Sequence, residues 1–291
     1  MPYRSVFRAG LFTGHNIVVT GGGSGIGRCT AQELAALGAH VMLVGRKPER
    51  LATVQAEIVE DGGLASSFVC DIREEARVQA CVAEIVAARG RIHALVNNAG
   101  GQFPAPLALI NQKGFETVVR TNLVGGFLFA RECFTQSMRD VGGDIVNIVA
   151  DFWNGMPGMG HSGAARAGMV NLTMTAALEW APAGVRVNAV APGWVASSGL
   201  DTYEGPVRAI IPKLRESVPL KRLATEAEVS AAIVFLLTEA ASFITGETIK
   251  VDGGAPLQSA LWPSPDHDKS KPYDGFHRAV TPKILARTEN R

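Results

Sequence analysis

The sequence is poor in the features that mark metal-binding, disulfide-bonded and membrane proteins. Its four cysteines, Cys29, Cys70, Cys81 and Cys133, stand singly, without the paired spacing of a zinc site or a redox dithiol. No apolar run reaches the roughly 18 residues that suggest a membrane span. The N-terminal "MPYRSVFRAG" lacks the apolar core of a secretory signal, and the C-terminal "TENR" is not a peroxisomal signal. We therefore expect free thiols, no metal site and a cytoplasmic protein.

The net charge of the chain is also close to zero. The 28 basic and 27 acidic side chains nearly cancel, which gives no reason to expect a nucleic acid or an anionic membrane as the main partner. With 291 residues, 47% of them hydrophobic, the chain can bury a sizeable core. We expect one domain over residues 1–291.

Short runs rich in valine and isoleucine alternate with longer stretches of helical period, the pattern of repeated βαβ units. The expected strands are "NIVVT" from Asn16, "HVMLVG" from His40, "SSFVC" from Ser66, "IHALVN" from Ile92, "DIVNIV" from Asp144, "VRVNAV" from Val185 and "ETIKVD" from Glu247. They predict an α/β fold of the Rossmann type: a doubly wound, seven-stranded parallel sheet with helices on both faces. Two segments interrupt the rhythm. Residues 193–223 predict a lid over a ligand, and residues 256–291 predict a tail packed along the surface.

A glycine-rich turn, "TGGGSGIG", joins the first expected strand to the first expected helix. Such a loop turns sharply, lets a pyrophosphate approach bare backbone and presents the N–H groups of a helix N-terminus to it. The alternative is a turn that only connects two elements. The residues expected at the phosphates are Gly21, Gly23, Ser24, Gly25, Ile26 and Gly27.

The end of the second strand favours NADP(H) over NAD(H). An acid there would accept a hydrogen bond from the adenosine ribose and repel a 2′-phosphate. The sequence reads "VGRKPER", with Arg46 and Lys47 in that place and no acid before Glu49. The two cations could also simply solubilise a turn.

Two further strand ends are expected to contact the cofactor. After the third strand, "CDI" places Asp71 and Ile72 where a carboxylate could hold the adenine amino group. After the fourth, "NNAGG" supplies Asn98, Ala99 and Gly100; Asn97 and Asn98 could also be ordinary turn formers.

In order and spacing, "TGGGSGIG", "CDI", "NNAG", "TNLVGGF", "IVNIV", "APGWV" and "FITGETIKVDGG" resemble the short-chain dehydrogenase/reductase family from Gly14 to Gly254. The resemblance implies an oxidoreductase that binds a nicotinamide nucleotide and usually forms a homotetramer. It implies that Asn122 is the active-site asparagine, which bends its helix and holds a water; the alternative is an ordinary helix asparagine. It also places Pro192, Gly193, Val195 and Ser197 beside the nicotinamide.

The family's other catalytic residues are missing. Where the family has a serine after the fifth strand, this chain has Val149 and Ala150. Where it has a tyrosine and, four residues later, a lysine, this chain has Ser162 and Arg166. Neither Tyr3, Tyr203 nor Tyr273 is followed by a lysine at that spacing.

The missing tyrosine favours reduction of a carbon–carbon double bond. Reducing a ketone leaves an alkoxide, so an acid must deliver a proton in the same step. Reducing an enoyl thioester spreads charge into an enolate, which hydrogen-bond donors can stabilise. "NNAGGQF", "HSGAARAG", "ASFITG" and "PDHD" are similar to peroxisomal trans-2-enoyl-CoA reductase and the 2,4-dienoyl-CoA reductases, which implies an NADPH-dependent enoyl-CoA reductase.

The resemblance suggests a role for each candidate catalytic residue. Arg166 could hold the nicotinamide ribose, and as a permanent cation it cannot donate the proton. His161 and Ser162 could donate to the thioester oxygen, and Asp151 is a candidate acid if burial raises its pKa; a loop histidine and a turn aspartate are the alternatives. The residues expected to form a substrate wall are Gly100, Gly101, Gln102 and Phe103. Candidate cations for the CoA phosphates are Lys213, Arg215, Lys221, Arg222, Lys269, Lys271 and Arg278.

Three other functions stay open at this point. The first is reduction of another activated C=C or C=N bond, and the second is carbonyl reduction or alcohol oxidation with a substituted catalytic set. The third is an NADP(H)-binding sensor or subunit without turnover.

Overall fold

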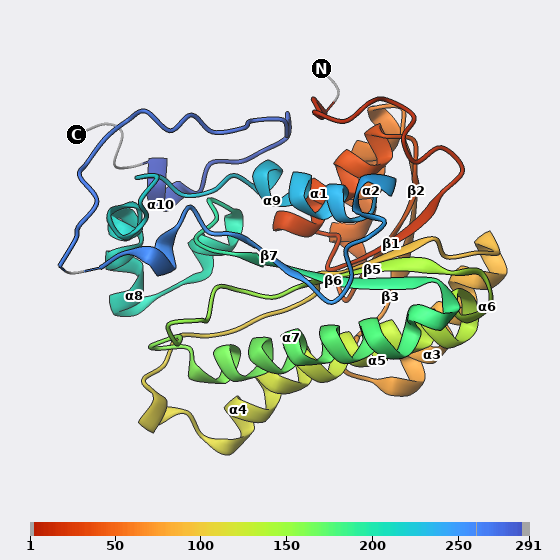
Figure 1. Cartoon of the computed structure of the whole chain (residues 1–291), viewed down its shortest axis with the longest axis horizontal. Helices are drawn as coiled ribbons and strands as arrows, with labels where there is room; N and C mark the ends of the chain where they lie inside the picture. The colour runs from red at the N-terminus through yellow and green to blue at the C-terminus, as the bar shows by residue number, and fades with distance from the viewer. Residues whose placement is uncertain (1–2, 260, 287–291) are drawn as a thin grey trace.

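The computed structural model describes residues 3–259 and 261–286. In this part of the chain seven parallel strands form one sheet, in the order β3-β2-β1-β4-β5-β6-β7 (Figure 1). The strands are β1 (Asn16–Thr20), β2 (His40–Gly45), β3 (Leu64–Val69), β4 (Ala94–Asn97), β5 (Gly143–Ile148), β6 (Val185–Pro192) and β7 (Thr248–Val251). The expected Rossmann-type doubly wound sheet is confirmed.

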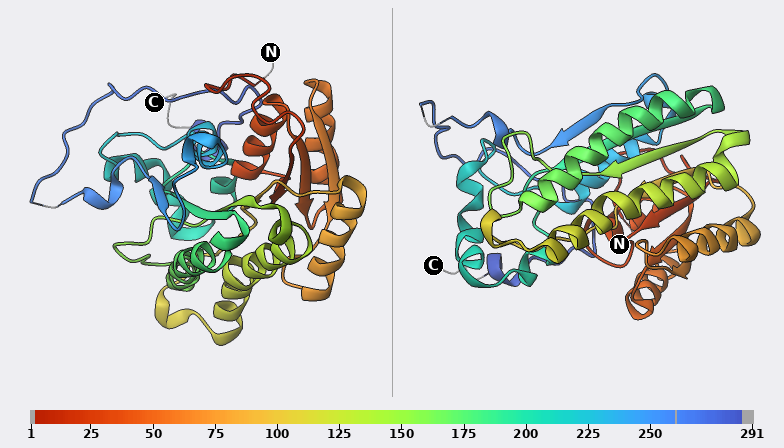
Figure 2. Two further views of the ribbon diagram at one scale, coloured as in Figure 1. Left: turned by 45° about the vertical axis from the view of Figure 1, so that its right-hand side comes forward. Right: turned by 90° about the horizontal axis from the view of Figure 1, so that it is seen from below.

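Helices cover both faces of the sheet (Figures 1 and 2). One face carries α1 (Gly25–Ala36), α2 (Pro48–Glu60) and α9 (Glu226–Leu236). The other carries α3 (Glu75–Arg89), α5 (Gly125–Cys133) and α7 (Gly160–Trp180). The shorter helices are α4 (Gln112–Val119), α6 (Arg139–Val141), α8 (Gly205–Ile210) and α10 (Lys283–Ala286).

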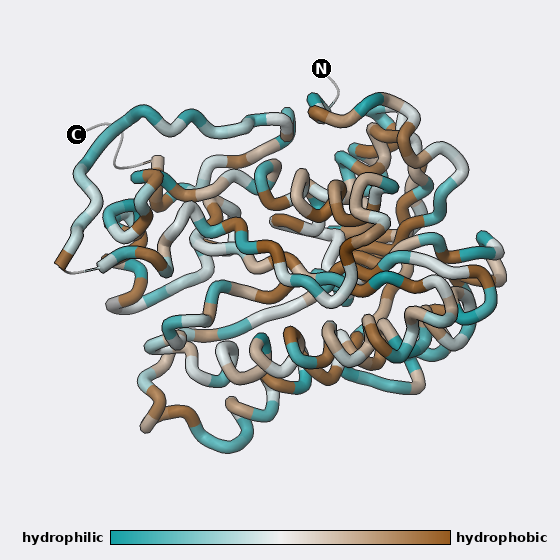
Figure 3. The backbone as a smooth tube through the Cα atoms, in the orientation of Figure 1, coloured by the Kyte–Doolittle hydropathy of each residue, from teal (hydrophilic) through white to brown (hydrophobic). Residues whose placement is uncertain are grey.

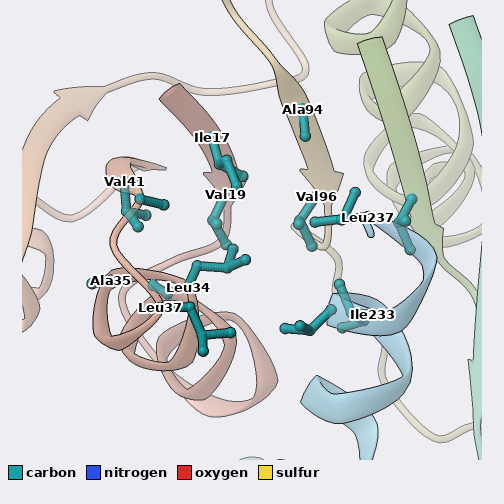
Figure 4. Close-up of a cluster of buried hydrophobic side chains, with 14 of the residues drawn as sticks. Ile17, Val19, Leu34, Ala35, Leu37, Val41, Ala94, Val96, Ile233 and Leu237 are labelled. Atoms are coloured by element: carbon teal, nitrogen blue, oxygen red, sulfur yellow. The ribbon is translucent and has the colours of Figure 1, made fainter. Parts of the chain in front are cut away.

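Each face of the sheet has its own hydrophobic core, because the strands are apolar on both sides. Figure 4 shows the first, in which Leu34 of α1 lies below Val19 of β1 and Ile233 of α9 lies below Val96 of β4. In Figure 3 the apolar residues gather in the sheet and on the helix faces against it, whereas the C-terminal segment that runs outside is largely polar. No helix in the described residues has the length and apolarity to cross a membrane.

The strand order reverses between β1 and β4, so the connections that leave their carboxyl ends go to opposite faces of the sheet and open a crevice between them. Ligands of open α/β sheets bind at such a switch point. The loops that follow β1 and β4 are the two that carry "TGGGSGIG" and "NNAGG".

The segment between β6 and α9 holds η5 (Ser198–Thr202), α8 and η6 (Ile211–Ser217). The lid predicted over residues 193–223 stays a prediction. After η8 (Ala255–Leu257) the chain runs past α9 to α2 and returns to α10 (Figure 2).

Candidate active site

The loops after β1 and β4 are tied together at the switch point. The hydroxyl of Thr20 accepts hydrogen bonds from the backbone amides of Asn98 and Ala99, each at 3.0 Å, and the side-chain amide of Asn98 donates to the Thr20 carbonyl at 2.9 Å. Gly21 has φ +67°, and a Cβ there would lie 2.8 Å from the Asn98 side chain. Glycine is therefore required where the two loops meet.

The N-terminus of α1 is open to a ligand. Its cap residue, Ser24, makes no side-chain cap hydrogen bond, and the first turn has no acidic residue. The first N–H groups of a helix need partners, and phosphate oxygens are good ones. Nine predicted residues line one cleft beside this helix end: Gly21, Gly23, Ser24, Arg46, Lys47, Asp71, Ile72, Ala99 and Gly100.

This cleft is strongly basic. Besides Arg46 and Lys47 it is lined by Arg50 and Arg73, which the sequence reasoning missed. The carboxylate of Asp71 accepts from Nε of Arg73 at 2.9 Å, and this pairing lowers the pKa of Asp71. The spacing held a clue to both, because Arg50 lies four residues after Arg46 and Arg73 two after Asp71. Four cations around one paired acid suit the extra phosphate of NADP(H).

Gly25 lines a neighbouring cleft, which also contains Glu226. A Cβ on Gly25 would lie 3.9 Å from the Glu226 carboxylate. Burial raises the pKa of Glu226 to about 7, although the charge of Arg28 opposes the shift. This acid was not foreseen, since glutamates near the start of a helix are usually exposed.

Asn122 lies in a π-helical turn, η2 (Arg120–Val124), and such turns are frequent at functional sites. Its side-chain amide binds the backbone of Gly101 twice, by accepting from the N–H at 3.0 Å and donating to the C=O at 2.7 Å. A Cβ on Gly100 would lie 2.7 Å from both Asn122 and Arg166. The structure thus brings Asn122, Arg166 and the 100–101 loop together.

Arg166 is a cation without an acidic partner in the described residues. One guanidinium nitrogen donates to the Ile148 carbonyl at 2.6 Å, and Nε is enclosed without a hydrogen-bond partner. Burial lowers the pKa of Arg166 to about 10, so it stays charged at neutral pH. An enclosed positive charge with an unused donor fits an oxygen-rich ligand, such as the ribose of a nicotinamide nucleotide.

Ser162 lies one turn before Arg166 on α7, but its hydroxyl is fully buried. It donates to Oε1 of Gln102 at 2.6 Å. On the other side, Nε2 of Gln102 donates to the hydroxyl of Tyr203 at 3.2 Å. Tyr203 was not among the predicted site residues, because it stands 101 positions from Gln102 and belongs to no local motif.

His161 and Asp151 have other surroundings. The His161 ring is buried edge-on against Phe103, with ring centroids 4.5 Å apart, and its Nε2 has no hydrogen-bond partner. The Asp151 amide donates to the Pro192 carbonyl at 3.0 Å. Burial and the nearby charge of Asp252 raise the pKa of Asp151. None of the contacts described for Asp151 reaches Ser162 or Arg166.

The remaining predicted cofactor residues lie around these groups. Gly27 packs so closely on Gly21 and Asn98 that no side chain fits. Gly193 lies against Asp252, where a Cβ would be 2.8 Å from its Cα. Ile26 packs on the first core, Val195 pairs with Ala224, and Ser197 caps η5. Their roles toward a cofactor stay predictions.

Most of the candidate CoA cations already have partners. Arg222 pairs with Glu228 and Arg278 with Asp61, at 2.6 and 2.8 Å. Lys221 is buried and donates to the Glu216 carbonyl. Arg215 lies 3.7 Å from Asp266, and Lys271 donates to the Asp268 carbonyl. Among the described contacts, only Lys213 and Lys269 leave their side chains free for a phosphate.

A family model and known proteins similar to this chain point to the same family. The family model described as enoyl-(acyl carrier protein) reductase matches residues 21–256. A Bacillus subtilis (strain 168) protein assigned as a 2,4-dienoyl-CoA reductase is 37% identical over 82% of this chain and 95% of its own length. The peroxisomal 2,4-dienoyl-CoA reductase of Danio rerio is 33% identical over 89% of this chain and 87% of its own. These relatives confirm the resemblance to the 2,4-dienoyl-CoA reductases.

Two solved structures add to this. The citronellol catabolism dehydrogenase AtuB of Pseudomonas aeruginosa PAO1 is 66% identical, with a TM-score of 0.79 over 87% of this chain and 99% of that one. A candidate NAD(P)-dependent gluconate 5-dehydrogenase from Beutenbergia cavernae, with NADP bound at low occupancy, is 32% identical, with a TM-score of 0.80 over 86% of this chain and all of that one. NADP(H) binding is consistent with this neighbour and with the basic cleft. The chain is an oxidoreductase and belongs to the short-chain dehydrogenase/reductase family.

Proposed function

We propose that this enzyme uses NADPH to reduce the C=C bond of an acyl-CoA in which the double bond is conjugated with the thioester, a trans-2-enoyl-CoA or a dienoyl or cyclic relative. The proposal depends mainly on the surroundings of the Ser162 hydroxyl. It stands in the family's tyrosine position, yet its hydroxyl is buried and donates to Gln102. The 2,4-dienoyl-CoA reductase relatives support the same substrate class.

The chemistry follows from what α7 lacks. A ketone needs an acid that gives up its proton as the hydride arrives, and neither the buried Ser162 nor the permanently charged Arg166 can do this. A conjugated thioester needs only stabilisation of the charge that moves onto its oxygen, and a modest acid or water can protonate the α-carbon afterwards. When bound, NADPH supplies the hydride for the β-carbon. The positive charge of Arg166 then favours the developing enolate.

Each part of the cofactor would be bound by a particular group of residues. The N-terminus of α1 would bind the pyrophosphate, and Arg46, Lys47, Arg50 and Arg73 would surround the 2′-phosphate. Arg166 would bind the nicotinamide ribose, because its guanidinium has an unused donor. Asn122 would hold the 100–101 loop in position through its two hydrogen bonds to Gly101.

We place the acyl chain against the loop that follows Gly101. Phe103 and Leu107 are both partly exposed and apolar. Phe103 packs on His161, and Leu107 lies where a Cβ of Gly160 would be 2.9 Å away, so both flank the start of α7. Lys213 and Lys269 are the cations we assign to the CoA phosphates. We further propose that residues 193–223 close over the substrate, and that the protein is a cytoplasmic homotetramer.

Oxidation of a branched terpenoid alcohol is the second candidate, supported by the 66% identity to the citronellol catabolism dehydrogenase. It needs a base for the alcohol proton, which α7 does not supply. We therefore rank it below C=C reduction.

The two candidates separate in one assay. Purified protein is mixed with NADPH and crotonyl-CoA or 2,4-hexadienoyl-CoA, and in parallel with NADP⁺ and citronellol, while NADPH absorbance is followed. We expect NADPH consumption with a thioester, and a saturated or monounsaturated acyl-CoA as product by mass spectrometry. Turnover of citronellol without turnover of either thioester would contradict the proposal.

A further inference from the structure

A chain of hydrogen bonds connects α7 to the segment after β6. It begins at the Ser162 hydroxyl, passes through the side-chain amide of Gln102 and ends at the Tyr203 hydroxyl, with donor–acceptor distances of 2.6 and 3.2 Å. Ser162 is fully buried, Gln102 is exposed and Tyr203 is half-buried. Gln102 and Tyr203 are therefore more accessible to a substrate than the Ser162 hydroxyl is.

The direction of these bonds decides which hydroxyl is free to donate. The Ser162 hydroxyl donates its only hydrogen to Oε1 of Gln102, so it cannot also donate a hydrogen bond to a substrate. The Tyr203 hydroxyl accepts a hydrogen bond from Nε2 of Gln102, so its own hydrogen remains available for donation to another group. Hydrogen bonds aligned head to tail polarise one another, so the chain strengthens the last donor.

We propose that the Tyr203 hydroxyl is the catalytic donor to the thioester oxygen, supplied by the segment after β6 in place of the missing tyrosine of α7. This rests on the proposed function. The hydride that NADPH would supply forms the new C–H bond at the β-carbon, the C=C π electrons move toward the thioester oxygen, and Tyr203 hydrogen-bonds that oxygen. The described contact of its hydroxyl is with Gln102 and not with a cation that would favour loss of its proton, so Tyr203 keeps the proton and does not serve as the acid of ketone reduction or the base of alcohol oxidation. A proton from water then completes the α-carbon.

Tyr203 is held in place on its apolar side. Its ring packs with a cluster formed by Leu200, Ile211 and Ile284, which joins η5, η6 and α10. The other two tyrosines are committed elsewhere: the Tyr3 hydroxyl donates to Glu33, and the Tyr273 hydroxyl donates to the Arg4 carbonyl at 2.6 Å. Tyr203 is thus the phenol positioned beside Gln102.

The first test is Tyr203→Phe, which removes only the hydroxyl. We expect kcat with crotonyl-CoA to fall on the order of 100-fold, the usual loss for one oxyanion donor, with an unchanged dissociation constant for NADPH. Tyr273→Phe is the matched control and keeps wild-type kcat. If wild type is active and Tyr203→Phe is equally active, Tyr203 is not the donor. If wild type reduces no thioester but oxidises citronellol, the proposed function fails. The same variants are then measured with citronellol, and unchanged oxidation by Tyr203→Phe would remove Tyr203 from the site as well.

The second test is Gln102→Glu, which examines Gln102 as a positioning residue. A carboxylate accepts from both neighbours and so turns the Tyr203 proton away from the substrate. A protonated carboxyl restores the pattern of glutamine, with one donor and one acceptor. We expect Gln102→Glu to be as slow as Tyr203→Phe at neutral pH and to regain kcat as the pH falls, whereas wild type does not. A loss that is independent of pH would assign Gln102 a merely structural role and overturn the chain.

Discussion

Single residues in this site owe their properties to what surrounds them. Arg166 could be foreseen from its place four residues after Ser162, but its isolation could not. It lies against Gly100 and Asn122 without an acid among its described neighbours, and burial lowers its pKa to about 10. A partly buried cation without a counterion costs stability in the free protein. A ligand that brings oxygen atoms to it recovers that cost on binding.

Glu226 gives a prediction at the same scale. Its pKa rises from 4.5 to about 7 because the side chain is buried. The folded protein therefore binds more protons than the unfolded chain between these values, and this contribution to stability is full below pH 4.5 and lost as the pH rises through 7. Glu226→Gln removes the ionisation, so at pH 8 we expect the variant to be more stable than wild type by up to about 3 kcal/mol in urea unfolding.

The control for this experiment lies two residues away on the same helix. Burial of Glu228 is outweighed by its hydrogen bonds with Arg222 and two backbone amides, so its pKa is lowered. Glu228→Gln should then lose stability at pH 8, the opposite sign. Equal stability of Glu226→Gln and wild type from pH 4 to pH 8 would mean that Glu226 ionises freely.

At the scale of elements, the sequence predicted the strands and their loops well and the contacts between distant loops poorly. Val-rich runs place β1, β2, β4 and β5 within a residue or two, because a strand buried on both faces must be apolar throughout. β6 runs on to Pro192 because its register with β7 continues to that residue. The pairing of Gln102 with Tyr203 leaves no periodic pattern, so only the structure reveals it. The family resemblance implied an irregular helix at Asn122, and the structure shows a π-helical turn there.

The turn between β2 and α2 is expected to determine the preference for NADPH over NADH. Arg46→Asp places a carboxylate at the end of β2, where it would accept from a ribose hydroxyl and repel a 2′-phosphate. We expect the ratio of NADPH to NADH affinity to fall roughly 10- to 100-fold, as replacing an attractive by a repulsive charge near the surface would do. The loss is partial because Arg50 and Arg73 remain in the cleft.

Fluorescence titration with both nucleotides measures this ratio. Lys113→Asp, an exposed charge reversal on α4, should leave it unchanged. A preference for NADPH that survives Arg46→Asp intact would remove the 2′-phosphate from this turn.

Across the whole molecule, the C-terminal segment fastens parts that are far apart in the sequence (Figures 1 and 2). Arg278 pairs with Asp61 at the end of α2, and Phe276 is buried. Farther along, the Asp201 carboxylate in η5 accepts from the backbone amides of Lys283 and Ile284 at 3.0 and 3.1 Å, so it caps α10. The side chain of Ile284 then packs in the cluster that holds Tyr203. Turn signals alone predicted a surface tail here, but not which element receives it.

Asp201→Ala should release this end of the segment without unfolding the sheet. Loss of a cap costs about 1 kcal/mol, which raises the open population roughly five-fold, and proteolysis follows that population when opening is fast. We therefore expect trypsin to cleave near Lys283 about five-fold faster, while β1 to β7 stay intact by mass spectrometry. Because Tyr203 shares the apolar cluster, kcat should fall while NADPH affinity holds. Asp268→Ala, which removes an exposed tail carboxylate, is the control. Unchanged cleavage in Asp201→Ala would show that the packing of Ile284 alone holds α10, and unchanged kcat would separate the tail from the site.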